Sequence, residues 1–164
     1  MKVFGLTIDP FTNAPIVILK DLDEKNALPV WIGVLEASSI AAELEKIHFT
    51  RPMTHDLVKE MLKNLEIAVT RVEVNDLRDN VYYATIHMRA HEKSVVIDAR
   101  PSDAIALALR MSSPIYVDTR VLDKSRNMEA RNDSAREAAG ESARKDPLDV
   151  LSGLEPNDFG KYKM

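Results

Sequence analysis

The sequence contains no cysteine, which removes disulfides, thiol nucleophiles and cysteine-bound zinc from consideration. No apolar run approaches the ~20 residues that a helix needs to cross a bilayer. The first ten residues also lack the apolar segment of a secretory signal peptide. Because 45% of the residues are apolar and 29% are charged, we expect a soluble protein with a packed core, no membrane association and a cytoplasmic location.

The sequence also lacks an excess of basic residues. Lys and Arg total 22 against 26 Asp and Glu, which gives a net charge of −4. A protein that holds nucleic acid mainly by neutralising phosphates carries a basic surplus. The composition therefore argues against a strong constitutive nucleic-acid binder. It still allows an enzyme with a local basic cleft, because net charge says nothing about distribution.

Three common motifs are missing as well. HExxH, Walker A and GxGxxG do not occur, which excludes zincins, P-loop proteins and dinucleotide-binding proteins of those motifs. Aromatic residues are few, and Trp31, Tyr82 and Tyr83 fall on predicted strands. We expect these three side chains to pack in the core rather than to stack on bases.

Alternation of apolar and polar residues predicts two groups of strands, one in the first quarter of the chain and one after residue 66. A change of phase near Thr70 predicts a β-bulge there, and a polar stretch predicts a turn over residues 75–80. The predicted strands are residues 3–9, 15–20, 28–33, 67–74, 82–89, 94–99 and 114–117.

Helical spacing appears between and after these strands. Ile40, Leu44 and Ile47 form one stripe after residue 33, and a second helix is expected behind Thr54, a residue suited to cap it. Residues 101–111 predict a helix that is apolar on nearly every side. We expect it to lie between layers or at a subunit contact, and in the latter case the simplest assembly is a symmetric dimer.

These elements predict an α+β fold, with a mixed or antiparallel β-sheet and about three packed helices in a single domain followed by a flexible tail. The domain is expected over residues 1–122. Charged and alanine-rich residues 123–147 predict a disordered linker or a solvated helix. Apolar residues reappear over 148–164, which either dock on a protein partner or fold back on the domain.

Two Arg-Pro dipeptides, at residues 51–52 and 100–101, precede predicted helices. Proline disfavours a helical conformation in the residue before it and is tolerated at a helix start. Each arginine is therefore held just outside a helix amino end, where unsatisfied N–H groups favour anions. The alternative is that each arginine simply pairs with a local carboxylate. The residues of the predicted phosphate site are Arg51, Thr54, Arg100 and Ser102.

Acidic side chains lie close to predicted helix starts. Asp98 ends the strand before Arg100, Asp103 falls in the first turn of the following helix, and Glu36 falls in the first turn of an earlier one. Carboxylates from separate strand-to-helix junctions can hold Mg²⁺ or Mn²⁺ and activate water for phosphodiester cleavage. Favourable interaction of an acid with a helix amino end explains each of them equally well. Glu36, Asp98 and Asp103 are thus candidate catalytic residues and metal ligands.

Of the four histidines, His55 is the candidate for proton transfer. It lies beside Asp56 in the first turn of a predicted helix, where it would act as a general base or as proton donor to a leaving oxygen. A solvated or capping histidine is the alternative.

Three segments, in this order, resemble the bifunctional nuclease domain family: LPVWIGVLEASSIA, RPMTHDLVKEML and IDARPSDAIALALRMSSPIYV. The resemblance covers about residues 1–122 and implies an α+β fold, usually oligomeric, with nuclease activity on DNA and RNA. The closing DFGKYKM is similar to the ending of some bacterial members. The family pattern falls on Glu36, Arg51, His55, Asp56, Asp98, Arg100, Ser102 and Asp103.

Two functions remain open at this point. The first is a nuclease, with nucleic acid as partner and Mg²⁺ or Mn²⁺ as the expected metal. The alternative is a non-catalytic regulatory module in which the same face binds an anion or a protein partner. Acidic net charge and the lack of a compact catalytic motif favour the module. The family resemblance favours the nuclease, which we place first.

Overall fold

The computed structural model describes residues 1–138, which form two β-sheets and four helices. The first sheet has the order β1-β2-β3 and the second β6-β5-β4-β7. This arrangement confirms the predicted α+β fold, with one helix more than expected. In chain order the elements are β1 (Lys2–Ile8), β2 (Pro15–Lys20), β3 (Ala27–Trp31), α1 (Val34–Leu44), α2 (Thr54–Asn64), β4 (Ile67–Arg78), β5 (Val81–Ala90), β6 (Lys93–Ala99), α3 (Pro101–Met111), β7 (Ile115–Val117) and α4 (Thr119–Ala138).

One apolar core joins the two sheets. Val17 and Leu19 of β2 and Val72 and Val74 of β4 are fully buried and belong to the same cluster. They sit at alternate positions of their strands, so their side chains share a face of each sheet. In the first sheet, β1–β2 and β2–β3 pair antiparallel. In the second sheet, β4–β5 and β5–β6 pair antiparallel, and β4–β7 pair parallel. The strand predictions are thus confirmed as a single packed unit.

β4 is longer than the sequence suggested. A register shift between Val69 and Arg71 confirms the bulge predicted near Thr70, but the strand continues to Arg78. The turn predicted over residues 75–80 is therefore wrong in extent. It consists of Asp79 and Asn80, which both adopt positive φ. A two-residue hairpin of this type needs positive φ at both positions, and Asp and Asn tolerate it.

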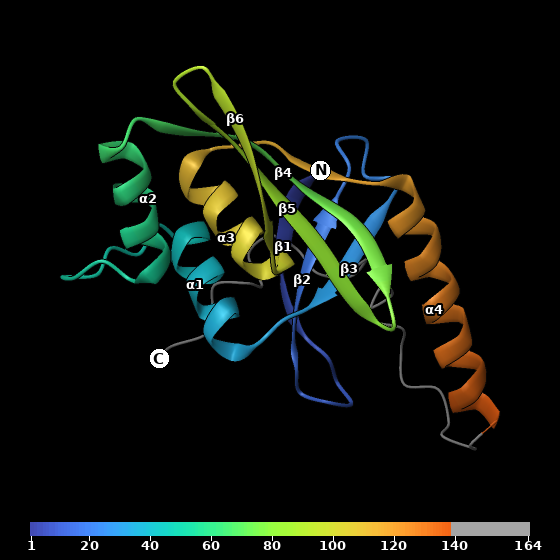
Figure 1. The fold of residues 1–164 in the computed structure, drawn as a ribbon. Coiled ribbons are helices and arrows are strands. Elements are labelled where there is room, and N and C mark those ends of the chain that lie inside the picture. Colours follow the sequence, from blue (N-terminus) through green and yellow to red (C-terminus); the bar gives the residue numbers. More distant parts are fainter. Residues whose placement is uncertain (139–164) are drawn as a thin grey trace.

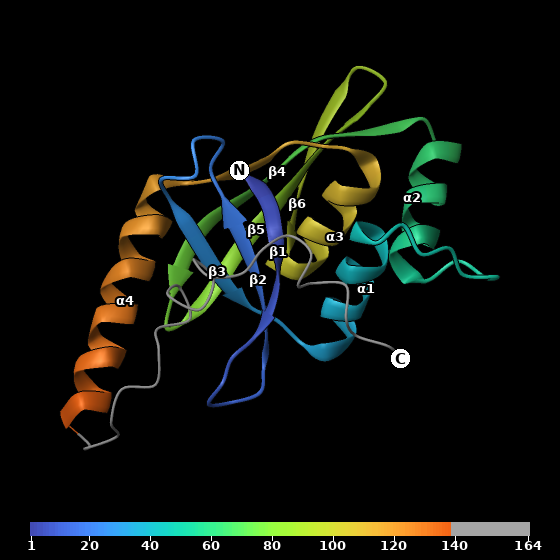
Figure 2. The ribbon, with the colours of Figure 1, turned by 180° about the vertical axis from the view of Figure 1, so that it is seen from behind.

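α3 lies inside the fold, in contact with α1, α2, β4 and β5. Most of its residues are buried, as predicted for a helix between layers. Because its own chain covers it, α3 gives no reason to expect a dimer. Figures 1 and 2 show α1, α2 and α3 gathered on one side of the sheets and α4 on the opposite side.

α4 begins at Thr119, so the domain boundary predicted at residue 122 falls within a helix. Val121 is fully buried, the Ser125 hydroxyl lies 3.0 Å from the Tyr82 hydroxyl, and Lys124 Nζ lies 2.7 Å from an Asp76 carboxylate oxygen. These contacts attach the first turns of α4 to β4 and β5. The predicted apolar peptide over 148–164 lies outside the described residues. Between residues 1 and 138, no helix is long and apolar enough to cross a bilayer.

Candidate functional site

The amino-terminal turns of α1 and α3 meet at Arg100. Its Nε and Nη2 donate to the two carboxylate oxygens of Asp103, at 2.7 and 3.1 Å. Its Nη1 lies 2.8 Å from Glu36 Oε1. Arg100 therefore bridges two of the predicted acidic residues, while 66% of its side chain stays exposed to solvent. A bidentate pair of this kind fixes the guanidinium plane.

Local backbone chemistry explains why Arg100 takes this position. It is the N-cap of α3, with extended backbone angles (φ −66°, ψ 143°), and Pro101 is the first helical residue. Proline disfavours a helical conformation in Arg100, as the sequence predicted. Asp103 follows three residues later, so its carboxylate folds back toward the N-cap side chain.

Gly33 places the second carboxylate. It is the N-cap of α1, and the Glu36 carboxylate lies directly over it, in space that a Cβ on residue 33 would occupy. Its backbone angles (φ −77°, ψ 162°) are ones that any residue adopts, so the glycine is needed here for space and not for conformation. The missing side chain of Gly33 lets Glu36 fold back over the start of α1, within reach of Arg100.

Hydrogen bonds and nearby charges hold the pair of Arg100 and Asp103 ionised. Burial raises the pKa of Asp103, but the hydrogen bonds from Arg100 and His55 outweigh burial, and the net pKa lies below the ordinary value. The hydrogen bond and the charge of Asp103, followed by the charge of Glu36, raise the pKa of Arg100. Two carboxylates facing one guanidinium leave an excess of negative charge.

His55 joins this cluster through Asp103. Its Nε2 lies 3.2 Å from Asp103 Oδ1, and its Nδ1 lies 2.8 Å from the Ser39 hydroxyl oxygen. An ionised carboxylate only accepts hydrogen bonds, so Nε2–H donates to Asp103, while Nδ1 and the Ser39 hydroxyl share the second hydrogen bond. Ser39 is buried and cannot reach a substrate. Both ring nitrogens of His55 are engaged, which fits a positioning role for this histidine better than proton abstraction.

A buried arginine of α3, Arg110, links this helix to α1 and α2. The Arg110 side chain is 2% exposed, and its Nε lies 2.6 Å from Asp56 Oδ1. Its other nitrogens donate to the carbonyls of Ala106 and Ser39, each at 3.1 Å. Burial raises the pKa of Asp56, but the hydrogen bonds from Arg110 and the Met53 N–H, together with the charge of Arg110, outweigh burial and keep the carboxylate ionised.

The sequence analysis missed Ser39 and Arg110. Each stands within a mostly apolar helical stretch, where a single polar residue suggested no partner. The available signal was the presence of one arginine near the end of an otherwise apolar buried helix. A buried charge has to be paired, so the arginine implied a carboxylate from another element.

A cavity of about 590 Å³ opens beside this cluster. Glu36, Arg100 and Ser102 line one part of it. Ser102 is 6% exposed, and its hydroxyl has no hydrogen-bond partner within residues 1–138. No acceptor among those residues takes the backbone N–H of Ser102 or Asp103. The start of α3 thus offers one hydroxyl, two N–H groups and a guanidinium, a set of donors suited to an anion.

Three other predicted site residues lie outside the cluster. Arg51 is exposed and forms no ion pair or hydrogen bond with the described part of the chain. Thr54 is the first residue of α2 and not its cap. The N-cap is Met53, whose N–H is taken by the Asp56 carboxylate at 3.0 Å. Asp98 pairs with Thr85 and points away from the core-facing side of β6, because neighbours on a strand alternate.

Metal-binding side chains are sparse at the site. Over residues 1–138, no group of three or more His, Asp or Glu side chains is placed to hold a metal ion. Glu36 and Asp103 are close enough to share Arg100, whereas the Asp98 carboxylate forms no hydrogen bond or ion pair with the described residues. The possible metal ligands are therefore the carboxylates of Glu36 and Asp103, with the guanidinium of Arg100 between them.

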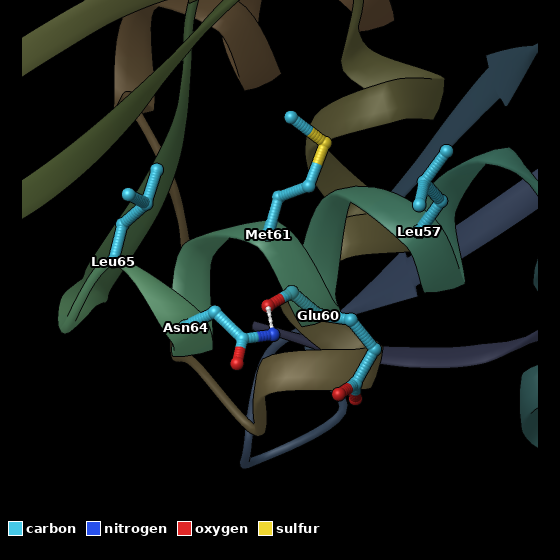
Figure 3. Close-up of a pocket in the computed structure, with 5 residues that line it drawn as sticks. All are labelled: Leu57, Glu60, Met61, Asn64 and Leu65. Carbon is cyan, nitrogen blue, oxygen red and sulfur yellow. Dashed lines mark hydrogen bonds between the residues drawn. The ribbon is translucent and has the colours of Figure 1, made fainter.

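A second hollow, of about 350 Å³, lies on α2 and differs in kind. Figure 3 shows Leu57, Met61 and Leu65 on one side of the helix, with Glu60 and Asn64 pointing the other way. The Asn64 side chain donates to the Glu60 carbonyl at 2.8 Å. All five residues belong to α2 or its C-cap, and Glu60 is their one ionisable side chain. We therefore place the candidate site at Arg100.

Comparison with known proteins gives a family for this arrangement. The model of the bifunctional nuclease domain matches residues 17–129. An uncharacterized protein of Mycobacterium tuberculosis is 31% identical over 163 residues, which cover 97% of this chain and 96% of the relative. Glu36, His55, Arg100 and Asp103 all lie within the matched region.

Plant relatives match a shorter part of both chains. Bifunctional nuclease 2 of Oryza sativa subsp. japonica is 29% identical over 117 residues, 69% of this chain and 36% of that protein. Bifunctional nuclease 1 of Arabidopsis thaliana is 31% identical over 119 residues, 70% of this chain and 36% of that protein. The similarity thus spans about a third of these plant proteins.

Proposed function

The chain belongs to the bifunctional nuclease domain family, and from this premise we propose that it hydrolyses phosphodiester bonds of nucleic acid in the cavity beside Arg100. The observation that carries the proposal is the set of donors at the start of α3. Arg100 and Ser102 line the cavity, and the Ser102 hydroxyl and the N–H groups of Ser102 and Asp103 have no acceptor within residues 1–138, so a phosphate is the ligand that this helix start suits.

Glu36 is the residue best placed to activate water. It lines the cavity, and its present partner is Nη1 of Arg100. A phosphate that takes Nη1 leaves the Glu36 carboxylate free to accept the proton of an attacking water. Asp103 holds the other edge of Arg100, and His55 holds Asp103. In this proposal Arg100 and Ser102 bind, Glu36 moves the proton, and Asp103 and His55 position Arg100.

Dependence on Mg²⁺ or Mn²⁺ is the finer part of the proposal. Mg²⁺ is commonly held by one or two carboxylates together with substrate phosphates. Glu36 and Asp103 fit an ion that is shared with the substrate, and they do not make an all-protein cage. When bound there, the ion would offset the excess negative charge of the two carboxylates.

The proposal is tested with purified protein and labelled single-stranded DNA, duplex DNA and RNA, each with Mg²⁺, Mn²⁺ or EDTA. We expect metal-stimulated cleavage that falls by about 10²–10⁴-fold in Glu36→Gln, the usual contribution of a positioned base. Glu43→Gln, an acid on the same helix outside the cavity, is the matched control. Absence of cleavage under every condition, or equal rates in wild type and Glu36→Gln, would contradict the proposal.

A non-catalytic binding module is the second candidate. It is favoured by the internal pairing of the cluster, since Arg100, Asp103 and His55 are already hydrogen-bonded to one another. Such a network serves binding as well as catalysis. Saturable binding of the same nucleic acids without any cleavage would support this candidate.

A further inference from the structure

The cavity beside Arg100 extends beyond the residues that would hold a phosphate. Trp31, Val81 and Met128 line another part of it. Its volume of about 590 Å³ falls within the roughly 300–1,000 Å³ of pockets that hold small organic ligands. A phosphate alone would fill only one end, so the remaining space fits a larger group attached to it.

Trp31 presents a fixed aromatic ring to this space. It is the last residue of β3, and its indole N–H donates to Asp9 Oδ2 at 2.9 Å. Asp9 is itself buried and accepts the N–H of Phe11 at 2.9 Å. Burial raises the pKa of Asp9, but the hydrogen bonds from Trp31, Phe11 and Thr12 together outweigh burial and lower the pKa, so the acceptor stays ionised. The ring orientation is therefore held while 36% of the residue remains exposed.

Such a ring is a stacking platform. Bases stack on aromatic side chains with about 1–3 kcal/mol per base and with little sequence preference, because every base has a π-face. The sequence analysis expected Trp31 to pack in the core, and its exposure in the cavity corrects that expectation. A single nucleotide carries both groups that this cavity accommodates, an anion and an aromatic ring.

We propose that the cavity holds an unpaired base against Trp31 while the phosphate of the same nucleotide lies at Arg100. This inference rests on the proposed function and narrows its substrate to single-stranded or locally unpaired nucleic acid. A base inside a duplex is stacked and paired, so presenting it would first cost a few kcal/mol.

The protein contains its own reporter, because Trp31 is its single tryptophan. A non-hydrolysable phosphorothioate tetranucleotide is titrated against the wild-type protein in Mg²⁺ while tryptophan fluorescence is recorded. The companion titrations use an abasic tetranucleotide with the same backbone, a blunt duplex and inorganic phosphate. We expect saturable quenching by the base-containing single strand and at least tenfold weaker quenching by the other three.

Substitutions separate the base from the phosphate. Trp31→Ala is expected to weaken single-strand binding by about 5–150-fold, the equivalent of losing one stacked base. Trp31→Phe should keep most of the affinity. Tyr83→Ala is the control, since Tyr83 is about as exposed as Trp31 but does not line the cavity. Its neighbour Tyr82, which lies on the other face of β5, does line the cavity. Unchanged affinity in Trp31→Ala, or equal quenching by the abasic strand, would overturn the proposal. Cleavage that persists in either case would leave the nuclease proposal intact.

β6 carries a second and independent inference. It is an edge strand: one side pairs with β5, and no strand of the described chain pairs with the other. Residues 93–98 are all exposed, among them Val95, Val96 and Ile97. Figure 1 shows β6 at the outer margin of the second sheet. An open edge with exposed β-branched residues is a template for pairing with another strand.

Charge and symmetry select the partner and the register. We infer that β6 pairs antiparallel with β6 of a second copy, about a twofold axis at Val96. Val95 then lies opposite Ile97, and Ser94 lies opposite Asp98, where a hydroxyl can donate to a carboxylate. A shift by two residues one way sets Glu92 opposite Asp98, and a shift the other way sets Val96 opposite Asp98. The first shift places like charges directly opposite each other, and the second replaces the hydroxyl opposite Asp98 by an apolar side chain, so both are disfavoured.

The absence of cysteine makes this register testable. Val96→Cys should form a disulfide-linked dimer within minutes of mild oxidation, because the axis places residue 96 beside its own copy. Leu22→Cys, which is more exposed than Val96, is the control and should stay monomeric on denaturing gels. Light scattering of the wild type should give a dimer, and Val96→Lys a monomer. A monomeric wild type at micromolar concentration, or a dimer in which Val96→Cys forms no crosslink, would overturn this inference.

Discussion

The two Arg-Pro dipeptides look alike in the sequence and differ in the fold. Arg100 is the N-cap of α3, Pro101 is its first residue, and Asp103 three positions later accepts hydrogen bonds from Nε and Nη2 of the guanidinium. Pro52 lies before the cap of α2, and Arg51 contacts no charged group among residues 1–138. The dipeptide therefore predicts a helix start in general terms, and the residue three positions after the arginine decides what that arginine does.

The acid at the start of α2, Asp56, binds other groups than the arginine of its own Arg-Pro dipeptide. Its carboxylate takes the N–H of Met53 and pairs with buried Arg110, so this helix is anchored by its own acid and by a distant arginine. At the start of α3, the exposed Arg100 is held in place by Asp103. At the start of α2, Asp56 pairs with Arg110, a buried arginine that extends from α3. The first arrangement leaves a cation for a ligand, and the second stabilises the fold.

The largest expected effect concerns this stabilising pair. Asp56→Ala leaves the Arg110 guanidinium unpaired with 2% of its side chain exposed, and breaking such a pair costs about 3–5 kcal/mol. Urea unfolding followed by circular dichroism measures the loss. Arg51→Ala should change the stability by less than about 0.5 kcal/mol, as expected for an exposed residue that pairs with nothing in the described part of the chain. Equal losses in both variants would show that α2 does not depend on Asp56.

A smaller effect is expected from Gly33→Ala, which acts on the Arg100 side of the comparison. The added methyl group occupies the space of the Glu36 carboxylate and displaces it from Arg100. We expect kcat/KM for nucleic acid to fall by about tenfold to a hundredfold, as for a misplaced catalytic group. The stability should change by about 1 kcal/mol or less. Unaltered kcat/KM would mean that the position of Glu36 does not matter for cleavage.

The smallest effect is on acid stability. Burial raises the pKa of Asp103, but the bonds from Arg100 and His55 outweigh it and leave the pKa below its ordinary value of 3.8. As pH falls, the unfolded chain therefore binds this proton before the folded protein does. The stability from Asp103 is complete above pH 3.8 and is lost as pH falls through the lower folded pKa.

Urea midpoints measured at pH 7, 5, 4 and 3 test this assignment. They should fall less steeply for Asp103→Asn than for the wild type, because the amide does not titrate. Arg51 holds no carboxylate among residues 1–138, so Arg51→Ala should follow the wild-type profile and serves as the control. Parallel profiles for Asp103→Asn and the wild type would contradict the assignment.

Local patterns predicted most of the fold. Alternation located the strands, the phase change at Thr70 located a bulge, and the start of α3 at Arg100 followed from a single proline. These features depend on neighbouring residues. The turn at Asp79 and Asn80 was misjudged because bulges in β4 disturb the alternation.

Long-range pairs were harder to foresee. Arg110 and Ser39 are 71 residues apart, and no periodicity connects them. Residues 123–147 were predicted as a disordered linker or a solvated helix, and the structure has a helix there as far as Ala138. Its contact with the core through Met128 was not foreseen, because its apolar residues are sparse. At the site, Glu36, His55, Arg100 and Asp103 were named from helix starts. Their mutual contacts arise from helix packing, which spacing does not encode.

Paired cleavage kinetics of Arg100→Ala and Arg51→Ala test the central claim most directly. Both variants remove one exposed arginine before a proline, and they differ only in what surrounds it. With single-stranded DNA and Mg²⁺, kcat/KM should fall by about 10²–10³-fold in Arg100→Ala, the loss expected for a main donor to the reacting phosphate. Arg51→Ala should stay within about twofold of the wild type. Equal losses in the two variants, or a larger loss in Arg51→Ala, would contradict the placement of the site at Arg100.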